Sequence, residues 1–401
     1  MSDSLLPPRR PTPSTLPEPD ESAMAVSAQL TRQIQQAMEQ AGGRIPFDSF
    51  MELALYAPGL GYYLAGSRKF GEAGDFVTAP EISPLFAQCL ARQAREVLGA
   101  LDGGEILEFG AGSGVLAADM LLELERLDAL PARYLIMELS PELKERQQRT
   151  LAQRVPELLS RVVWLEHLPR EFRGLVVANE LLDAMPVSRF RVTAGGIEEC
   201  FVEQDEEGLK EAFAAPQTPG LAKAVERLES AVGGLAEGYV SEINLRQSSW
   251  LRALAGMMDS GAVLLIDYGY PRNEYYHPQR STGTLMCHYR HRAHPDPFRW
   301  VGLQDITTHV DFSALVEVAV EAGFDLAGYT TQAHFLMASG LDELVAASDP
   351  EDLTKHMELV QGVKRLTLPS EMGERFKVIG LMKTMEINLA GFNRFNLQSR
   401  L

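Results

Sequence analysis

The chain has 401 residues, of which 45% are hydrophobic and 23% charged, enough to bury the core of one large domain or of two domains. Its net charge of −18 argues against a nucleic-acid partner, because binding phosphates needs clustered Lys and Arg. No stretch approaches the roughly 18 apolar residues that a membrane span requires, so we expect no membrane span.

The beginning of the chain is rich in proline. Residues 1–24 hold six prolines and both signs of charge, without the apolar core of a signal peptide or the Arg-rich amphipathic pattern of a transit peptide. Cys89, Cys200 and Cys287 lie far apart and form no CxxC motif, which indicates reduced thiols. We therefore expect a disordered tail and a cytoplasmic protein.

Residues 25–98 are expected to form a helical N-terminal segment. Apolar positions recur at helical spacing over about 24–40, 46–59 and 84–98. Between the last two helices, residues 66–83 are polar and rich in glycine. Long loops inside compact domains are usually functional, so this loop is a candidate part of a site.

From residue 105 onwards, short apolar runs alternate with helical patterns. The expected strands are 105–110, 133–139, 162–168 and 174–180, and the expected helices are 114–127 and 140–153. This alternation indicates a parallel sheet covered by helices on both faces. We expect the α/β domain to occupy residues 99–401.

An excursion of about 190–255 interrupts this rhythm. It begins as a hairpin over 189–204, and residues 205–248 are expected to be helical and polar. The sheet resumes with a buried strand at 261–269. After a polar stretch to about 308, we expect a helix over 311–322 and a last strand at 374–384, which we predict to be reversed.

The stretch "ILEFGAGSGVLAADML", residues 106–121, joins a strand to a helix through a glycine-rich loop. A phosphate-binding GxxxxGK[ST] motif is absent, and the third glycine of a dinucleotide-binding GxGxxG would fall at Val115. The observed Glu108-x-Gly110-x-Gly112-x-Gly114 is the form seen in class I methyltransferases. There the bare backbone lets the methionine half of S-adenosylmethionine approach, with its carboxylate near the helix start.

Glu138 is a second sign of a nucleoside ligand. It ends the next strand, 24 positions beyond Gly114, where an acidic side chain can accept hydrogen bonds from ribose hydroxyls. Two other interpretations remain open. The glycines could form only a tight turn with Glu138 capping a helix, or the loop could belong to an NAD-dependent oxidoreductase.

Eight motifs, in order from about residue 45 to 383, resemble the MidA-like methyltransferases. They are LALYAPGLGYY, GDFVTAPEISPLF, LEFGAGSG, MELSPELKERQ, VVANELLDAMPVSRF, LLIDYG, DITTHVDF and MGERFKVI. That family includes the mitochondrial complex I assembly factor that methylates an arginine of a complex I subunit. The resemblance implies a Rossmann-like class I fold, with a doubly wound, mostly parallel seven-stranded sheet, a helical N-terminal segment and insertions.

The resemblance also implies the cofactor, S-adenosyl-L-methionine, and the residues that bind it. Family members often carry Pro and Thr where this chain has Ala111 and Val115. The resemblance implies that five residues close over the cofactor, namely Gly74, Asp75, Thr78, Glu81 and Ser83. Ser83 could equally cap the following helix. The remaining contacts would come from Glu108, Gly110, Ala111, Gly112, Gly114, Glu138 and Leu139.

The methyl acceptor is expected where the strand over 174–180 ends, because parallel sheets carry their sites beyond the carboxyl ends of the strands. That end reads Asn179-Glu180-x-x-Asp183. Two carboxylates suit the donor fork of a guanidinium. We expect Glu180 and Asp183 to orient the acceptor and Asn179 to line the site. Alternatively, Asp183 caps the next helix and Glu180 faces solvent.

Five of the eight histidines lie between 277 and 309. His288, His291 and His294 fall in a polar loop, where their three-residue spacing does not suit metal ligands, so we expect no metal. The same loop would present Tyr289 to a protein substrate. His309 and Asp311 would lie near the acceptor, with a helix cap as the alternative role of Asp311.

These observations predict a methyltransferase that acts on an arginine side chain of a protein, of the complex I subunit type by resemblance. Two alternatives are methylation of a small molecule or of another residue type, and a cofactor-binding assembly chaperone with little catalysis. A homodimer is compatible with the sequence.

Overall fold

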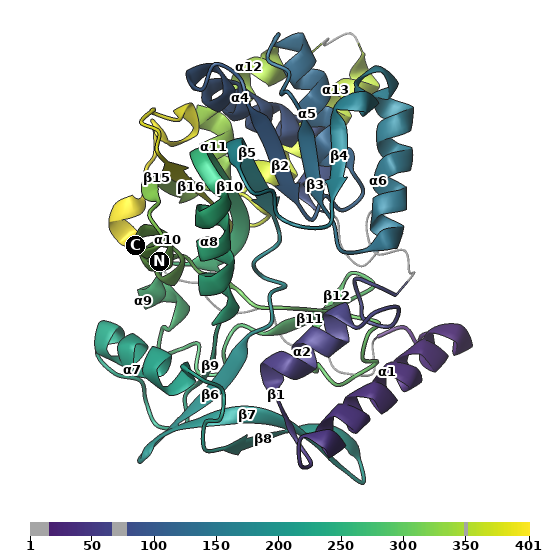
Figure 1. Ribbon diagram of the computed structural model, residues 1–401, viewed down its shortest axis with the longest axis vertical. Helices are drawn as coiled ribbons and strands as arrows, with labels where there is room; N and C mark the ends of the chain where they lie inside the picture. Colours follow the sequence, from purple (N-terminus) through teal and green to yellow (C-terminus); the bar gives the residue numbers. More distant parts are fainter. Residues whose placement is uncertain (1–15, 66–77, 349–351) are drawn as a thin grey trace. The chain divides into compact units, whose positions relative to one another are not determined.

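The computed structural model describes residues 16–65, 78–348 and 352–401, which belong to two compact units. Unit 1 comprises residues 1–76, 186–244 and 281–308, and unit 2 comprises residues 77–185, 245–280 and 309–401. The chain therefore leaves unit 2 twice, after residue 185 and after residue 280. Both excursions start after strands of the unit 2 sheet (Figure 1).

Unit 2 is built on one large sheet in the order β15-β16-β10-β5-β2-β3-β4, with β14 beside β10. Its strands are β2 (Glu105–Phe109), β3 (Tyr134–Met137), β4 (Val162–Leu165), β5 (Phe172–Asn179), β10 (Met258–Tyr270), β14 (Val310–Asp311), β15 (Asp325–Thr331) and β16 (Phe376–Lys383). Neighbouring strands from β4 to β10 run parallel, whereas β16 runs antiparallel to both β10 and β15. The doubly wound sheet with seven strands in its main order and a reversed last strand is confirmed, and β14 is a short eighth strand beside β10.

Alternating side chains bury both faces of this sheet. Ile106, Leu175 and Leu264 point into one hydrophobic cluster, while their chain neighbours Leu107 and Val176 point into the other. Strands buried on both faces read as largely apolar runs, as GLVVA does and as EILEF does apart from its two glutamates. The carboxyl ends of β2, β3, β5 and β10 therefore meet at one edge of a rigid sheet.

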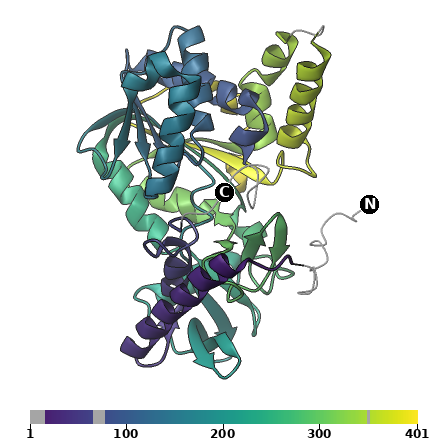
Figure 2. The same cartoon turned by 90° about the vertical axis from the view of Figure 1, so that its right-hand side faces the viewer.

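The first face is covered by helices from both ends of unit 2. They are α3 (Ala79–Ile82), α4 (Pro84–Ala100), α5 (Val115–Arg126), α6 (Pro141–Arg154), α11 (Gln332–Ala338), α12 (Leu341–Ala346) and α13 (Leu353–Thr367). Helices α8 (Arg246–Met257) and α10 (Phe312–Glu321) cover the second face. The short helical segments are α9 (Arg272–Tyr275), η2 (Pro156–Arg161), η3 (Ala390–Phe392) and η4 (Gln398–Arg400). Figure 2 shows the yellow-green α13 beside the blue α3–α4 segment, against which it packs.

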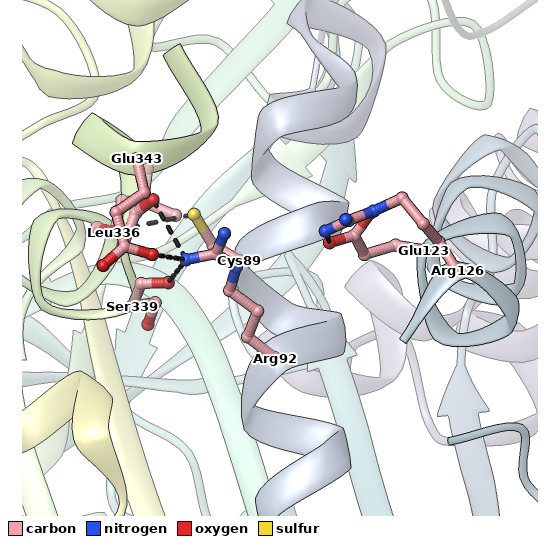
Figure 3. Close-up of polar contacts among 8 residues, drawn as sticks. Cys89, Arg92, Glu123, Arg126, Leu336, Ser339 and Glu343 are labelled. Atoms are coloured by element: carbon pink, nitrogen blue, oxygen red, sulfur yellow. Dashed lines mark hydrogen bonds and ion pairs between the residues drawn. The ribbon is translucent and has the colours of Figure 1, made fainter. Parts of the chain in front are cut away.

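Helix α4 is fixed to the C-terminal helices by polar contacts (Figure 3). Arg92 donates to the carbonyl oxygens of Ser339 and Gly340, which end α11, and lies 2.8 Å from the Glu343 carboxylate. The Cys89 thiol donates to the Leu336 carbonyl at 3.7 Å. A cation near the C-terminus of a helix interacts favourably with the helix dipole. These contacts therefore hold α4 against α11 and α12.

Unit 1 combines helices with two small antiparallel sheets. One sheet has the order β1-β7-β6-β9 with β8 on β7, and the other the order β12-β11-β13. The elements are α1 (Glu21–Gln40), β1 (Ile45–Pro46), α2 (Phe47–Tyr56), β6 (Ser188–Thr193), β7 (Gly196–Asp205), β8 (Gly208–Ala214), α7 (Leu221–Val232), β9 (Val240–Ile243), β11 (Met286–Tyr289), β12 (Arg292–His294) and β13 (Asp305–Thr307). Leu30, Phe50, Val202, Cys287 and Ile306 join all these layers in one core.

The structure differs from the sequence-based expectations in three places. Residues 205–248 are not all helical, because β8 and β9 extend the hairpin into a sheet. The stretch up to 308 contains β11, β12 and β13 rather than only a loop. Helix α1 begins at Glu21, capped by Asp20, inside the stretch expected to be a disordered tail.

Candidate functional site

The glycine loop lies between β2 and α5, at the carboxyl edge of the sheet. Gly110, Gly112 and Gly114 have φ values of 65°, 52° and 83°, in the left-handed region that favours glycine. Gly110 is exposed, whereas Ala111 is 6% exposed and packs into the core. Helix α5 begins without a capping side chain. Its first N–H groups and the bare loop can therefore receive a carboxylate ligand.

Glu108 lies beneath this loop, within the core. Its carboxylate is 2% exposed and accepts a hydrogen bond from the Tyr134 hydroxyl at 2.7 Å. Burial raises the pKa of Glu108 to about 7, although the hydrogen bond from Tyr134 acts in the opposite direction. The glutamate that opens the motif thus ties β2 to β3 underneath the glycines.

Glu138 follows β3 and is half-buried beside the loop. Its Oε1 accepts from the backbone N–H of Ser140 at 2.9 Å and its Oε2 from Gln147 Nε2 at 2.8 Å. Helix α6 is capped by Ser140, whose hydroxyl accepts from the Leu143 N–H, so Glu138 is not the helix cap that was the alternative. The next side chain, Leu139, is 70% exposed. A half-buried carboxylate beside an exposed apolar side chain suits the ribose and base of a nucleoside.

The segment expected to cover the cofactor is described only in part. Gly74 and Asp75 lie outside the described residues. Thr78 precedes α3 in an extended conformation without a capping hydrogen bond, and the half-buried Glu81 lies in the first turn of α3. Ser83 is buried, and its hydroxyl accepts from the Leu85 N–H at 3.3 Å. The capping interpretation of Ser83 is therefore correct, whatever contacts it makes with a ligand.

The predicted acceptor residues lie at the end of β5, in a turn. Glu180 has φ +52°, a strained conformation for glutamate, and its N–H donates to the Ile266 carbonyl on β10 at 2.9 Å. Asn179 Nδ2 donates to Glu180 Oε1 at 3.1 Å. No helix starts at residues 181–185, so Asp183 is not a helix cap. Asn179 Oδ1 and Asp183 Oδ1 are buried and have no hydrogen-bond partner among the described residues.

Asp267, on β10 next to β5, is the site residue that the sequence analysis missed. Its Oδ2 accepts from the N–H groups of Leu182 and Asp183 at 2.9 and 3.2 Å, and its Oδ1 from the N–H of Tyr268 at 2.9 Å. The side chain is 1% exposed. Its motif, LLIDYG, was visible in the sequence, but its place beside Asp183 depends on the strand order, in which β10 lies next to β5.

The carboxyl groups of Asp183 and Asp267 influence each other. Burial raises the pKa of Asp183 to about 6, while a hydrogen bond from the Tyr268 side chain lowers it. Burial and then the charges of Asp183 and Glu180 raise the pKa of Asp267 well above its ordinary value. Crowded buried acids hold on to a proton until a cation arrives. This end of the sheet is therefore suited to a positively charged ligand.

The three predicted substrate residues have different surroundings. The His309 ring lies edge-on to Tyr268, with centroids 5.1 Å apart, and stacks on Tyr270 at 5.2 Å, so it adjoins the group that contacts Asp183. Asp311 caps α10 by accepting from the Ala314 N–H at 3.0 Å, which is its alternative role. Tyr289 belongs to unit 1, where it is 4% exposed.

The histidines expected to lie in a loop are spread over a hairpin. His288 is on β11, His294 on β12, and His291 in the turn between them. Among the described residues, no group of three or more His, Cys, Asp or Glu side chains could hold a metal ion. Within the same ranges, no helix is long and apolar enough to cross a bilayer.

Known proteins resemble this chain along most of its length. The model of a family described as S-adenosyl-L-methionine-dependent methyltransferases matches residues 89–330. Protein arginine methyltransferase NDUFAF7, mitochondrial, of Mus musculus is 30% identical, over 94% of this chain and 90% of its own. The Danio rerio protein of the same name is 29% identical, over 86% and 85%.

Two crystal structures of a protein from Burkholderia thailandensis share the fold, at 44% sequence identity, and cover 96% of this chain and 100% of that one. One holds S-adenosyl-homocysteine and has a TM-score of 0.92, and the native structure has a TM-score of 0.89. The glycine loop, the uncapped α5 and Glu138 provide what such a ligand needs. The chain belongs to the MidA-like family of S-adenosyl-L-methionine-dependent methyltransferases.

Proposed function

We propose that this enzyme methylates a guanidino nitrogen of an arginine side chain in a protein. The observation that carries the proposal is the acidic group at the ends of β5 and β10, made by Glu180, Asp183 and Asp267, which the sequence places in two separate motifs. A guanidinium carries five N–H donors and a permanent positive charge, and its natural partners are carboxylates and amide oxygens. The arginine methyltransferase names of relatives about 29% identical point the same way.

The side chains of this group would divide the work. Asp183 Oδ1 and Asn179 Oδ1 are the buried acceptors with no partner among the described residues, so they are assigned to grip the guanidinium. Asp267 accepts hydrogen bonds from three backbone N–H groups, so its part is to shape the turn that carries Asp183. Binding that draws positive charge towards one side of the guanidinium leaves a far nitrogen more nucleophilic.

The cofactor supplies an electrophilic methyl group on a sulfonium, and the protein supplies alignment and proton handling. Glycine loop contacts at one end and the acidic group at the other would hold the two reactants in line, which accounts for much of the rate of a displacement. The attacking nitrogen must also lose a proton. An ionised carboxylate whose pKa lies near 6, such as that of Asp183, is suited to accept it.

The test is methyl transfer from isotopically labelled cofactor to a cell extract from the same source, followed by mass spectrometry of the labelled product. The resemblance to the complex I assembly factor makes subunits of that complex the first proteins to assay. Methylarginine in one protein is the expected result. A labelled metabolite would show that the acceptor is a small molecule, and a different labelled residue would show that it is not arginine. Cofactor binding without methyl transfer would support an assembly chaperone.

Variants connect the activity to the acidic group. Asp183→Asn should reduce turnover at least about a hundredfold while the affinity for S-adenosyl-homocysteine stays within a factor of about two. The matched control is Asp259→Asn, at the exposed opposite end of the strand that carries Asp267, and it should be fully active. Normal turnover by Asp183→Asn would remove the role assigned to that carboxylate.

A further inference from the structure

Gln147, on α6, is a buried polar side chain that connects three parts of the cofactor site. It is 0% exposed. Its Nε2 donates to Glu138 Oε2 at 2.8 Å and to the carbonyl oxygen of Gly112 at 3.2 Å, while its Oε1 accepts from Trp164 Nε1 at 2.9 Å. One amide thus joins the glycine loop, the acid after β3 and the indole of β4.

The orientation of this amide is determined by its partners. An indole N–H can only donate, so the amide oxygen must face Trp164. The amide nitrogen then faces the carboxylate of Glu138 and the carbonyl of Gly112, which can only accept. A flipped amide would place acceptor against acceptor at these two sites and donor against donor at Trp164. Trp164 therefore selects the orientation that serves the loop and Glu138.

The backbone of Gln147 is as close to the loop as its side chain. A Cβ added at Gly114 would lie 3.0 Å from Gln147 Cα and 3.3 Å from its Cβ. The backbone of α6 at Gln147 thus packs against Gly114, the last glycine of the loop. The Gln147 side chain donates to the carbonyl oxygen of Gly112, the middle glycine. Gln147 thus adds a side-chain connection between the loop and Glu138 to the backbone pairing of β2 with β3.

Two hydrogen bonds hold the Glu138 carboxylate on the side of α6. An ionised carboxylate offers about four lone-pair positions. Ser140 N–H donates to Oε1 and Gln147 Nε2 donates to Oε2. These two bonds fix the plane of the carboxylate.

We infer that Gln147 is a positioning residue for the cofactor: anchored by Trp164, it sets the distance and orientation between the glycine loop and the Glu138 carboxylate before the nucleoside binds. The inference rests on the assignment of the loop and Glu138 as cofactor contacts. Binding is favoured when such groups are held in place in advance, because less ordering remains to be done on binding.

The experiment is titration calorimetry of S-adenosyl-homocysteine with purified full-length variants. Gln147→Leu should weaken binding about tenfold or more, because it removes the Nε2 donor from the Glu138 carboxylate and from the Gly112 carbonyl and leaves the Trp164 N–H without its acceptor. Trp164→Phe, which removes only the anchor of the amide, should weaken binding less. The matched control is Gln148→Leu, on the neighbouring but exposed glutamine of α6, and it should bind like the unmodified protein.

Gln147→Glu separates positioning from mere packing. It keeps the size of the side chain but sets an acid against Glu138, so affinity should fall at neutral pH. It should recover as the pH is lowered, because a proton shared by the two acids restores a donor. This recovery does not require Gln147→Leu to fold. The unmodified protein should lack it.

Two results would decide against the inference. Binding within a factor of about two for a folded Gln147→Leu, or a Gln147→Glu variant whose affinity stays low at every pH, would overturn the positioning role. Glu138→Gln, measured alongside, tests the assignment beneath it. If that variant binds normally, Glu138 is not a cofactor contact, and the failure lies in the site assignment rather than in Gln147.

Discussion

Asp267 accepts a hydrogen bond from the backbone N–H of Asp183 at 3.2 Å. The buried Asp267 carboxyl group thus joins the ends of the adjacent parallel strands β5 and β10, and the buried carboxyl group of Asp183 lies beside it. Two acids in one dry location cannot both ionise at the usual pH. The charge available for a cationic acceptor should therefore depend on pH in the range where enzymes work.

The first prediction concerns that dependence. Burial raises the pKa of Asp183 to about 6, and only the ionised form attracts a guanidinium or accepts its proton. With saturating cofactor, kcat/KM for the protein acceptor should rise as pH increases through about 6. The measurement is a pH–rate profile. Asp183→Asn should lose this rise along with most activity, and an unchanged profile in that variant would assign the titration to another group.

The second prediction concerns stability. The pKa of Asp183 is raised in the folded state, from the ordinary 3.8 to about 6, so its stabilising contribution is fully present below 3.8 and is lost as pH rises through 6. The difference corresponds to at most about 3 kcal/mol at pH 8. Asp183→Asn should therefore raise the free energy of unfolding at pH 8, and the gain should shrink towards pH 4.

Urea denaturation at the two pH values measures this gain. Asp259→Asn, an exposed carboxyl on the same sheet, should show none. Equal destabilisation of Asp183→Asn at both values would mean that the carboxyl makes contacts in the folded protein that outweigh its burial. The expected combination of a more stable and less active variant is typical of acids held in place for function.

The sequence predicted the parallel sheet because its strands are buried on both faces. EILEF and GLVVA are short, largely apolar runs, and the alternation of such runs with helical patterns is typical of a parallel sheet covered by helices. In unit 1 the hairpin of β6 and β7 was predicted, but the strands added to it and the second sheet were missed for the opposite reason. β8 is half-polar and β11–β13 have three or four residues each, too short for a period-two pattern to appear.

The cofactor side of the candidate site could be predicted because its residues are close in sequence. The glycines and Glu138 belong to one βαβ unit, made of β2, α5 and β3. In such a unit, the spacing along the sequence determines where each residue lies. Asp267 and Gln147 could not be predicted in the same way. Asp267 reaches Asp183 only through the placement of β10 beside β5, and Gln147 looks like any polar residue of a helix until α6 is packed.

The third prediction tests the buried pair beneath the loop. Burial raises the pKa of Glu108 to about 7, and the Tyr134 hydroxyl opposes that rise. Tyr134→Phe removes this donor, so ionising Glu108 becomes more costly. The variant should lose about 1–3 kcal/mol of stability at pH 8 and less at pH 6, where Glu108 is mostly protonated in both proteins.

Thermal unfolding at both pH values checks this prediction. In a Glu108→Gln background the carboxyl is absent, so Tyr134→Phe should then have the same effect at pH 6 and pH 8. A pH-independent loss in the original background would attribute the effect to the contact of the Tyr134 hydroxyl with Met120 Sδ, at 3.7 Å, rather than to the charge.

The fourth prediction compares two glycines of the loop. Both have left-handed φ values, 65° at Gly110 and 83° at Gly114, so alanine at either position costs about 1 kcal/mol of strain. A Cβ at Gly110 meets only Leu181 Cδ1 at 3.6 Å, an ordinary contact, whereas one at Gly114 meets the Gln147 backbone at 3.0 Å. Gly114→Ala should therefore lower the melting temperature clearly more than Gly110→Ala.

The affinity for S-adenosyl-homocysteine should rank Gly110→Ala and Gly114→Ala differently from their melting temperatures. Gly110 is exposed at the start of the loop, so its new methyl group occupies the side from which a ligand arrives, and Gly110→Ala should lose affinity for S-adenosyl-homocysteine out of proportion to its stability. Gly99→Ala is the control, because Gly99 lies in α4 with no atom near the added Cβ; it should be neutral or slightly stabilising. If Gly110→Ala bound the ligand normally, the cofactor would have to approach the loop from another direction.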